Sequence, residues 1–156
     1  MPTLAILIGL QASGKTTFYC QTLAPEYVHV SKDNWPNARR RQERQLRLAG
    51  EALAAGLSIA VDNTNPTPEE WRPLAEVARS HGAKVVGYWF PPDVGGSLRR
   101  NAARTGRKRV PDVGIFATKK SLRRPERSDG FDELYEVRID GAGGFDVRPL
   151  EDEATE

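Results

Sequence analysis

Short apolar runs recur along the chain and alternate with longer stretches whose apolar positions lie three or four residues apart. Continuous apolar runs are typical of strands buried on both faces of a parallel sheet, and the wider spacing is typical of amphipathic helices. The pattern predicts five strands, over residues 4–8, 27–30, 57–61, 84–90 and 134–139. It predicts a helix that begins near residue 15 and further helices over residues 37–55, 67–82, 93–104 and 112–124.

The alternation of strands and helices over 156 residues predicts one α/β domain, with a mostly parallel five-stranded sheet and helices on both of its faces. We expect this domain to span residues 1–150. A glycine cluster at 141–144, followed by residues 145–147, predicts a small hairpin near its end. The last residues, 151–156, are mostly acidic and are expected to form a disordered tail.

The sequence Gly-Leu-Gln-Ala-Ser-Gly-Lys-Thr at residues 9–16, directly after the first strand, is a complete P-loop motif. Such a loop, placed between a buried strand and a helix, wraps a phosphate with its backbone N–H groups. Lys15 is expected to reach the β- and γ-phosphates of a nucleotide, and Thr16 is expected to bind Mg²⁺ through its hydroxyl. The nucleotide-binding residues expected in this segment are Gly9, Gln11, Ala12, Ser13, Gly14, Lys15, Thr16 and Thr17.

Two acidic residues lie where strands are expected to end, and ligands of α/β sheets bind at that edge. Asp33 follows the second expected strand, and its carboxylate either takes a proton from an acceptor alcohol or caps a helix. Asp62 ends the third expected strand and either holds a metal-bound water, as a Walker B acid does, or belongs to a turn. Asp33 is therefore a candidate general base, and Asp62 joins Thr16 as a candidate metal-binding residue.

Residues 99–109 contain six basic side chains and no acidic one. Within this segment Arg100 and Arg104 are four residues apart and would share one face of a helix, where like charges repel unless an anion lies between them. The pattern favours a basic lid that closes over phosphate; the alternative is an ordinary solvated face. Arg100 and Arg104 are candidates for nucleotide binding, and Arg104 is also a candidate catalytic residue.

Charge is unevenly distributed, because residues 1–125 carry a net charge of +10 and residues 126–156 carry −8. The basic part suits an anionic ligand such as a nucleotide or nucleic acid. Cys20 is the only cysteine, which excludes a disulfide framework and favours a reducing cytoplasm, and we expect it to be a small buried side chain. No apolar run is long enough to span a membrane, and the N-terminal run lacks the pattern of a signal peptide.

Arginines also line the long helix expected after the second strand, where Arg40, Arg44 and Arg47 form a row. The row is either a track for a nucleic-acid backbone or a solvated face partly paired with Glu43. Trp35, just before this helix, belongs either to the core or to a surface on which a base stacks. The residues alone leave both alternatives open.

Taken together, these motifs resemble the 5′-kinase domain of phage and animal polynucleotide kinases. The P-loop is common to many unrelated families, whereas the string after the third strand and the Arg-Asn-x-x-Arg segment are far more specific. The resembling segments are residues 9–16, Ser31-Lys32-Asp33, Val61-Asp62-Asn63-Thr64-Asn65-Pro66, Arg100-Asn101-x-x-Arg104, Val110-Pro111 and Gly130-Phe131.

The resemblance implies a P-loop kinase sandwich with a basic helical lid, ATP or another NTP and Mg²⁺ as cofactors, and a nucleic acid 5′-hydroxyl end as acceptor. It implies that Asp33 is the general base and that Arg104 stabilises the transferring phosphoryl group, with Arg100 as a weaker partner. It also implies that Asp62 and Asn63 lie near the metal and the acceptor.

Two departures from the family bear on the acceptor. Phage enzymes carry an arginine that meets the acceptor phosphate where this chain has Pro36. Arg39 or Arg40 could replace that arginine, and Arg44 is a further candidate for acceptor binding. The repair enzymes of the family also fuse the kinase to a phosphatase, and this sequence contains only the kinase part.

Three functions follow from these observations. The first is an ATP- and Mg²⁺-dependent kinase for the 5′-hydroxyl ends of DNA or RNA. The second is a kinase for a small metabolite, such as a sugar, nucleoside or antibiotic hydroxyl, which would need no basic acceptor groove. The third is a nucleotide-binding ATPase module that serves a partner protein and would tolerate the loss of Asp33.

Overall fold

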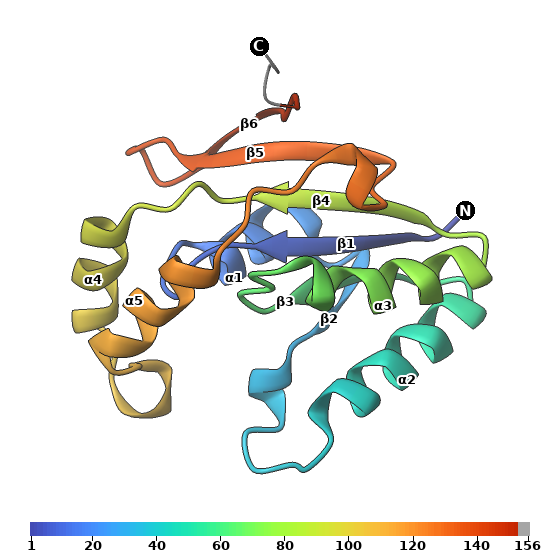
Figure 1. The fold of residues 1–156 in the computed structure, drawn as a ribbon, viewed down its shortest axis with the longest axis horizontal. Coiled ribbons are helices and arrows are strands. Elements are labelled where there is room, and N and C mark those ends of the chain that lie inside the picture. The colour runs from blue at the N-terminus through green and yellow to red at the C-terminus, as the bar shows by residue number, and fades with distance from the viewer. Residues whose placement is uncertain (153–156) are drawn as a thin grey trace.

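A six-stranded sheet in the order β2-β3-β1-β4-β5-β6 forms the centre of the computed structural model, which describes residues 1–152 (Figure 1). The first five strands are parallel, and β6 runs antiparallel to β5. The α/β class and the mostly parallel sheet are confirmed, whereas the expected number of five strands is wrong. The strands are β1 Thr3–Ile8, β2 Tyr27–Val30, β3 Ser58–Asp62, β4 Lys84–Trp89, β5 Glu133–Ile139 and β6 Phe145–Pro149.

The sixth strand comes from the expected hairpin, whose second arm joins the main sheet. The Asp140 carboxylate accepts hydrogen bonds from the N–H groups of Ala142 at 2.7 Å and Gly144 at 3.0 Å, which closes the turn. Val147 of β6 then lies opposite Val137 of β5. The sequence hides this strand because β6 is at the edge of the sheet and is mostly exposed, so it carries no continuous apolar run.

Helices cover both faces of the sheet, as expected. On one face, α2 and α3 bury a large apolar core in which Ile6 and Val61 of the sheet meet Leu53 and Trp71 of the helices. The five α-helices are α1 Lys15–Phe18, α2 Arg41–Ala54, α3 Pro68–Ser80, α4 Val94–Ala102 and α5 Asp112–Ser121. Shorter turns are the π-helical Tyr19–Leu23 and the 3₁₀ turns Lys32–Asn34, Gly106–Lys108 and Arg127–Asp129.

The opposite face carries a smaller core under α1 and the π-helical turn. Phe18 and Leu23 are buried there against Leu7 of β1 and Phe90, the residue after β4. Cys20 is exposed, which corrects the expectation that it is buried. The wider π turn places residues five apart, Phe18 and Leu23, on the sheet and turns Cys20 outward.

Several helix bounds differ from the prediction: α3 ends at Ser80 rather than at residue 82, and α5 ends at Ser121 rather than at residue 124. α2 starts at Arg41 rather than at residue 37, because Arg40 adopts a left-handed conformation with φ of 55°. α4 ends at Ala102, so Arg104 lies beyond the helix and does not share a helix face with Arg100. The helices α4 and α5 lie beyond the ends at which the parallel strands finish, at the left of Figure 1.

The ends of the chain add two observations. No helix within residues 1–152 is long and apolar enough to cross a membrane. Of the predicted acidic tail, Glu151 and Asp152 are described: Arg124 donates to the carbonyl of Glu151, and the Arg127 N–H lies 3.3 Å from the Asp152 carboxylate. Residues 153–156 lie outside the described residues.

Candidate active site

The P-loop follows the central strand β1 and leads directly into α1, at the edge of the sheet where the parallel strands end. Two glycines shape it. A Cβ on Gly9 would lie 2.8 Å from the Cβ of Phe90, so no larger residue fits there without a shift of the backbone. Gly14 has a φ of 95°, a conformation that glycine adopts without strain. The loop therefore has the shape that lets backbone N–H groups surround a phosphate.

Lys15 turns back onto its own loop. Its Nζ donates hydrogen bonds to the carbonyls of Gly9 at 3.1 Å and Leu10 at 2.7 Å, and the side chain is only 7% exposed. Burial lowers the pKa of Lys15 to about 8, although the negative charges of Asp62 and Asp33 raise it; the positive charge of Arg104 lowers it further. The P-loop amine thus lies within the electrostatic reach of all three of these predicted site residues.

Asp62, the last residue of β3, lies beside the P-loop helix and is 5% exposed. Its Oδ2 accepts a hydrogen bond from the Thr16 hydroxyl at 2.6 Å and lies 2.8 Å from Nε2 of His29. Burial alone would raise the pKa of Asp62, but the hydrogen bonds from His29 and Thr16, together with the charge of Lys15, lower it overall. The carboxylate is therefore held in its charged form.

His29 is the site residue that the sequence did not reveal. The sequence indicates a strand residue, and His29 does lie on β2, yet it also contacts the candidate metal-binding carboxylate of Asp62. The signal was in the topology, because parallel pairing of β2 with β3 places His29 opposite Ala60, two residues before Asp62. No spacing within the sequence encodes that pairing.

Asp33 lies in the 3₁₀ turn after β2, and its side chain is exposed. Ser31 is the capping residue of this turn, since its Oγ accepts the Asp33 N–H at 3.2 Å. Asn63 fixes the turn to β3 and α2: its Oδ1 accepts the Lys32 N–H at 2.9 Å, and its Nδ2 donates to Gln45 Oε1 at 2.7 Å. The Asp33 carboxylate is therefore exposed, and Asn63 holds the turn on which it lies.

The rest of the Asp-Asn-Thr-Asn string ties β3 to the P-loop strand. Asn65 is 2% exposed, and its Nδ2 donates to the Leu7 carbonyl at 2.7 Å. The Gly9 N–H donates to the carbonyl of Thr64 at 3.0 Å, and the Trp71 indole donates to that of Asn65 at 2.6 Å. These bonds hold the start of the P-loop against the end of β3, where Asp62 lies.

The basic segment, residues 99–109, begins in the last turn of α4 and contacts the P-loop there. Arg100 Nε donates to the carbonyl of Ala12 within the loop at 2.6 Å, and its burial lowers the pKa of its guanidinium. Arg104 follows the helix, and its Nη1 lies 3.3 Å from the Lys108 carbonyl. Asn101, fully buried, exchanges two hydrogen bonds with the backbone of Val110, at 2.7 and 3.0 Å, and so closes the loop over residues 102–110. Here Arg100 anchors the segment, and Arg104 acts on Lys15 through its charge.

The candidate acceptor residues lie on the segment that follows Asp33. The Arg44 guanidinium carbon lies 4.6 Å from the centre of the Trp35 ring, and Arg39 and Arg40 are exposed. Two arginines of the predicted row pair with acidic side chains: Arg40 Nη1 lies 3.9 Å from Glu43, and Arg47 Nε lies 3.8 Å from Glu51. The predicted row therefore divides into Arg44, which lies over the Trp35 ring, and Arg40 and Arg47, which pair with acidic side chains; the expected pairing with Glu43 is confirmed for Arg40.

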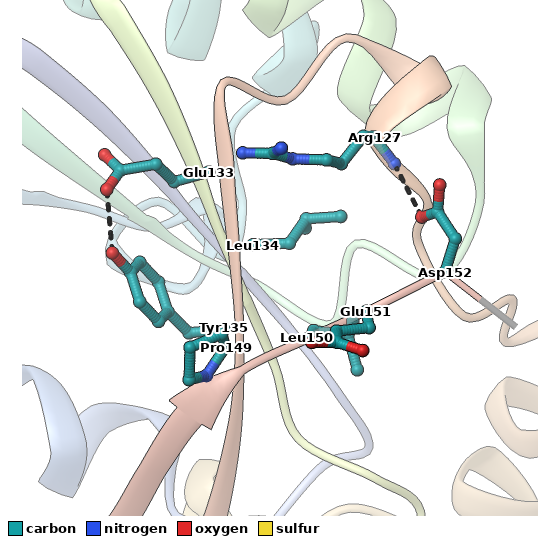
Figure 2. A pocket seen from close by; sticks show the side chains of 8 residues that line it. All are labelled: Arg127, Glu133, Leu134, Tyr135, Pro149, Leu150, Glu151 and Asp152. Atoms are coloured by element: carbon teal, nitrogen blue, oxygen red, sulfur yellow. Dashed lines mark hydrogen bonds between the residues drawn. The ribbon is translucent and has the colours of Figure 1, made fainter.

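A second hollow lies on the other side of the molecule, where β5 begins and β6 ends (Figure 2). It has a volume of about 400 Å³. Figure 2 shows Glu133, Glu151 and Asp152 around it, with Arg127 as its basic side chain. This predominantly acidic groove does not suit a polyphosphate.

Within residues 1–152, no group of three or more His, Cys, Asp and Glu side chains could hold a metal ion by itself. The hydroxyl of Thr16 and the carboxylate of Asp62 are hard oxygen donors of the kind that Mg²⁺ prefers. Since Thr16 donates its proton to Asp62, the lone pairs of its oxygen remain free. These residues fit a Mg²⁺ ion whose remaining ligands are water and substrate phosphates.

Comparison with known proteins places this site in a family. The AAA domain family AAA_33 matches residues 4–126. The bifunctional polynucleotide phosphatase/kinase of Schizosaccharomyces pombe is 24% identical over 138 residues, which cover 86% of this chain and 33% of that protein. The chain thus spans a third of the length of this relative.

Two solved structures share the fold. A fungal RNA kinase superposes with a TM-score of 0.69 at 16% identity, over 88% of this chain and 38% of the other. A gluconokinase from Sinorhizobium meliloti 1021 gives 0.63 at 20% identity, over 89% of this chain and 83% of the other. At such identities the structures show the fold alone. With a family match that spans most of its length, the chain belongs to the AAA_33 family of AAA domains, and its fold is that of a P-loop kinase.

Proposed function

We propose that this protein is an ATP- and Mg²⁺-dependent kinase that transfers the γ-phosphoryl group to the 5′-hydroxyl of a DNA or RNA end. The observation that carries the proposal is the exposed carboxylate of Asp33, on a turn that Asn63 holds against the end of β3, where Asp62 contacts Thr16 of the P-loop. A carboxylate in this turn after β2 can take the proton of an acceptor hydroxyl, which is the role that a kinase requires of it.

In this mechanism Lys15 exchanges the carbonyls of Gly9 and Leu10 for phosphate oxygens of the donor. Asp33 accepts the proton of the attacking hydroxyl, and Arg104 stabilises the charge on the transferring group. Thr16 and Asp62 would hold Mg²⁺, which supplies charge neutralisation on the phosphates. Positioning and electrostatics provide most of the catalysis in such transfers.

The surface beside Asp33 supports a nucleic acid acceptor. Trp35 lies two residues after Asp33, is partly exposed and is covered on one side by Arg44. An aromatic ring beside arginines suits stacked bases and a phosphate backbone. The relative in S. pombe includes polynucleotide kinase in its name, and the proposal extends that acceptor class to this chain.

A small-molecule acceptor is the second candidate, and Pro36 is the observation that favours it. Proline stands where the phage enzymes that the sequence resembles carry the arginine for the acceptor phosphate. A site without that contact is better suited to an acceptor that has no phosphate next to its hydroxyl.

A transfer assay tests the proposal directly. The purified chain is incubated with Mg²⁺ and γ-labelled ATP, together with 5′-hydroxyl DNA, 5′-hydroxyl RNA, nucleosides, gluconate and other sugars. We expect label on an oligonucleotide and none on the matched 5′-phosphorylated oligonucleotide. Label only on a small molecule would establish the second candidate, and release of phosphate without any labelled acceptor would indicate an ATPase module.

A further inference from the structure

His29 occupies a place in the site that phosphoryl transfer itself does not require. It lies on β2 with its side chain 28% exposed, and its Nε2 is 2.8 Å from Oδ2 of Asp62. The ring is held from the side by Tyr19, whose ring centre lies 4.7 Å away at a tilt of 54°. Tyr19 in turn donates its hydroxyl proton to the carbonyl of Tyr27 on the same strand. The imidazole is therefore fixed between the π-helical turn and Asp62.

Two donors converge on a single oxygen of Asp62. Thr16 donates to Oδ2 at 2.6 Å, and His29 approaches the same oxygen with Nε2. A carboxylate oxygen has no proton to give, so the His29 nitrogen that faces it is the donor. With Oδ2 held from both sides, rotation of the carboxylate is restricted, and Oδ1 is left for other partners.

We infer that His29 is a positioning residue that fixes the carboxylate of Asp62 for the divalent cation bound with the donor nucleotide. The inference rests on the proposed function only in requiring a metal-nucleotide complex, and it does not depend on the acceptor. Partners that orient metal-binding groups typically change metal affinity or activity by about 10–100-fold when they are removed. The role is distinct from packing, because a side chain of similar size without a donor would fill the space but not hold Oδ2.

The test compares two substitutions of similar bulk. His29→Gln keeps an N–H donor near the position of Nε2, and His29→Leu has none. Calorimetric titration measures ADP binding with Mg²⁺ or Mn²⁺ and with chelator. We expect His29→Leu to raise the metal concentration needed for half-saturation about tenfold. The affinity for ADP without metal should stay within about twofold of wild type. His29→Gln should bring the metal requirement most of the way back to the wild-type value. His81→Leu, at an exposed histidine that ends α3, is the matched control.

A double substitution keeps the inference testable if His29→Leu also lowers stability. In the background of Asp62→Asn, the change His29→Leu should not raise the metal requirement further, because its target is gone. Equal metal requirements for His29→Leu and wild type, equal impairment by Leu and Gln, or additive effects with Asp62→Asn would overturn the inference. The ADP titrations contain no acceptor. A failure to phosphorylate oligonucleotides would therefore refute the proposed function without affecting the test of His29.

Discussion

Lys15 shows how the fold changes the chemistry of one side chain. Its ammonium group donates hydrogen bonds to two carbonyls of the P-loop and is almost fully buried, and its pKa falls from 10.5 to about 8. A bound polyphosphate would add several negative charges around the amine, which favours the protonated form. Nucleotide binding should therefore take up a proton whenever the empty site is partly deprotonated.

This linkage gives a pH dependence with a definite sign. Below pH 8 Lys15 is already charged, so its ionisation should not change nucleotide affinity with pH. Above pH 8 the affinity should fall, to about tenfold weaker at pH 9 than at pH 7. Calorimetry in buffers of different ionisation enthalpy measures the proton uptake directly. Lys15→Met should abolish both the uptake and the slope, and a wild-type affinity that is constant between pH 7 and 9 would contradict the burial of this amine.

The stability of the empty protein should respond to the same group in the opposite direction. Between about pH 8 and 10.5 the unfolded chain binds more protons at Lys15 than the folded chain does. The cost of burying the charge is therefore fully present below pH 8 and is lost as the pH rises. Comparison of the free energy of unfolding of wild type with that of Lys15→Met across this range isolates the contribution of Lys15.

At the scale of elements, the lid segment, residues 99–110, contains residues with separate structural and catalytic roles. Arg100 is bonded to the P-loop carbonyl of Ala12, Asn101 closes the loop over residues 102–110, and Arg104 lies in that loop beyond the end of α4. These three roles belong to separate residues, so each can be tested alone.

Arg104→Ala should lower the rate of phosphoryl transfer by about 10²–10³-fold with a smaller loss of ATP affinity, because its contact matters most when charge develops on the transferring group. Arg104→Lys should restore little, since an ammonium cannot reproduce the planar guanidinium fork. Steady-state kinetics provide the measurement, with Arg107→Ala, at an exposed arginine of the 3₁₀ turn, as the control. A fully active Arg104→Ala protein would remove the lid arginine from the mechanism.

Asn101→Ala should destabilise the fold by about 1–3 kcal/mol, because it leaves the partly buried N–H and C=O groups of Val110 without these partners. The loop over residues 102–110 should also become sensitive to limited proteolysis. Urea unfolding checks the first effect, with Asn37→Ala, at an exposed loop residue, as the control. An effect no larger than that of Asn37→Ala would show that the two hydrogen bonds do not brace the loop.

The sequence predicts an element well where a local pattern, such as a continuous apolar run, specifies it. The continuous apolar runs of β1 and β4 and the glycine pattern of the P-loop are local, and each lies where it was expected. β6 was missed because an exposed edge strand has polar side chains and gains its place only through pairing with β5. The start of α2 was misplaced because the left-handed turn at Arg40 is not encoded by helical periodicity.

The candidate site was likewise predicted where the signal is local in the sequence and missed where it depends on pairing between elements. Lys15, Thr16 and Asp62 were predicted from motifs, since a P-loop and an acid at a strand end have fixed spacings to their own elements. His29 reaches Asp62 only across the β2–β3 pairing, and the burial of Lys15 depends on contacts within the folded loop. Interactions between elements distant in the chain are what the sequence alone did not resolve.

At the scale of the whole molecule, charge is separated between the two ends of the sequence. The acidic residues from 126 onward include Glu133, Glu151 and Asp152 around the groove of Figure 2, whereas the basic residues of the first 125 include the exposed arginines beside Trp35. A field of this kind steers a polyanion toward the basic side. The separation is useful for a nucleic acid acceptor and unnecessary for a neutral sugar.

The affinity for a single-stranded acceptor should therefore depend on salt, by about 0.7 log units per log unit of salt for each phosphate contact. Replacing Arg39 and Arg44 together with Gln should flatten this slope by about two contacts and leave ATP binding unchanged. Arg47→Gln is the matched control, since Arg47 is already engaged with Glu51. Fluorescence anisotropy across a salt series provides the measurement, and an acceptor affinity that is independent of salt would favour a small uncharged acceptor.

The most direct single measurement is the rate at which wild type and Asp33→Asn place labelled phosphate on a 5′-hydroxyl oligonucleotide under saturating ATP. Asn keeps the shape of the side chain but cannot take a proton, and removal of a general base typically costs about 10²–10⁴-fold in rate. We expect wild type to label the 5′ end and Asp33→Asn to be slower by that factor with ATP affinity preserved. Wild-type protein that labels no 5′ end, or an Asp33→Asn protein as fast as wild type, would contradict the proposed mechanism.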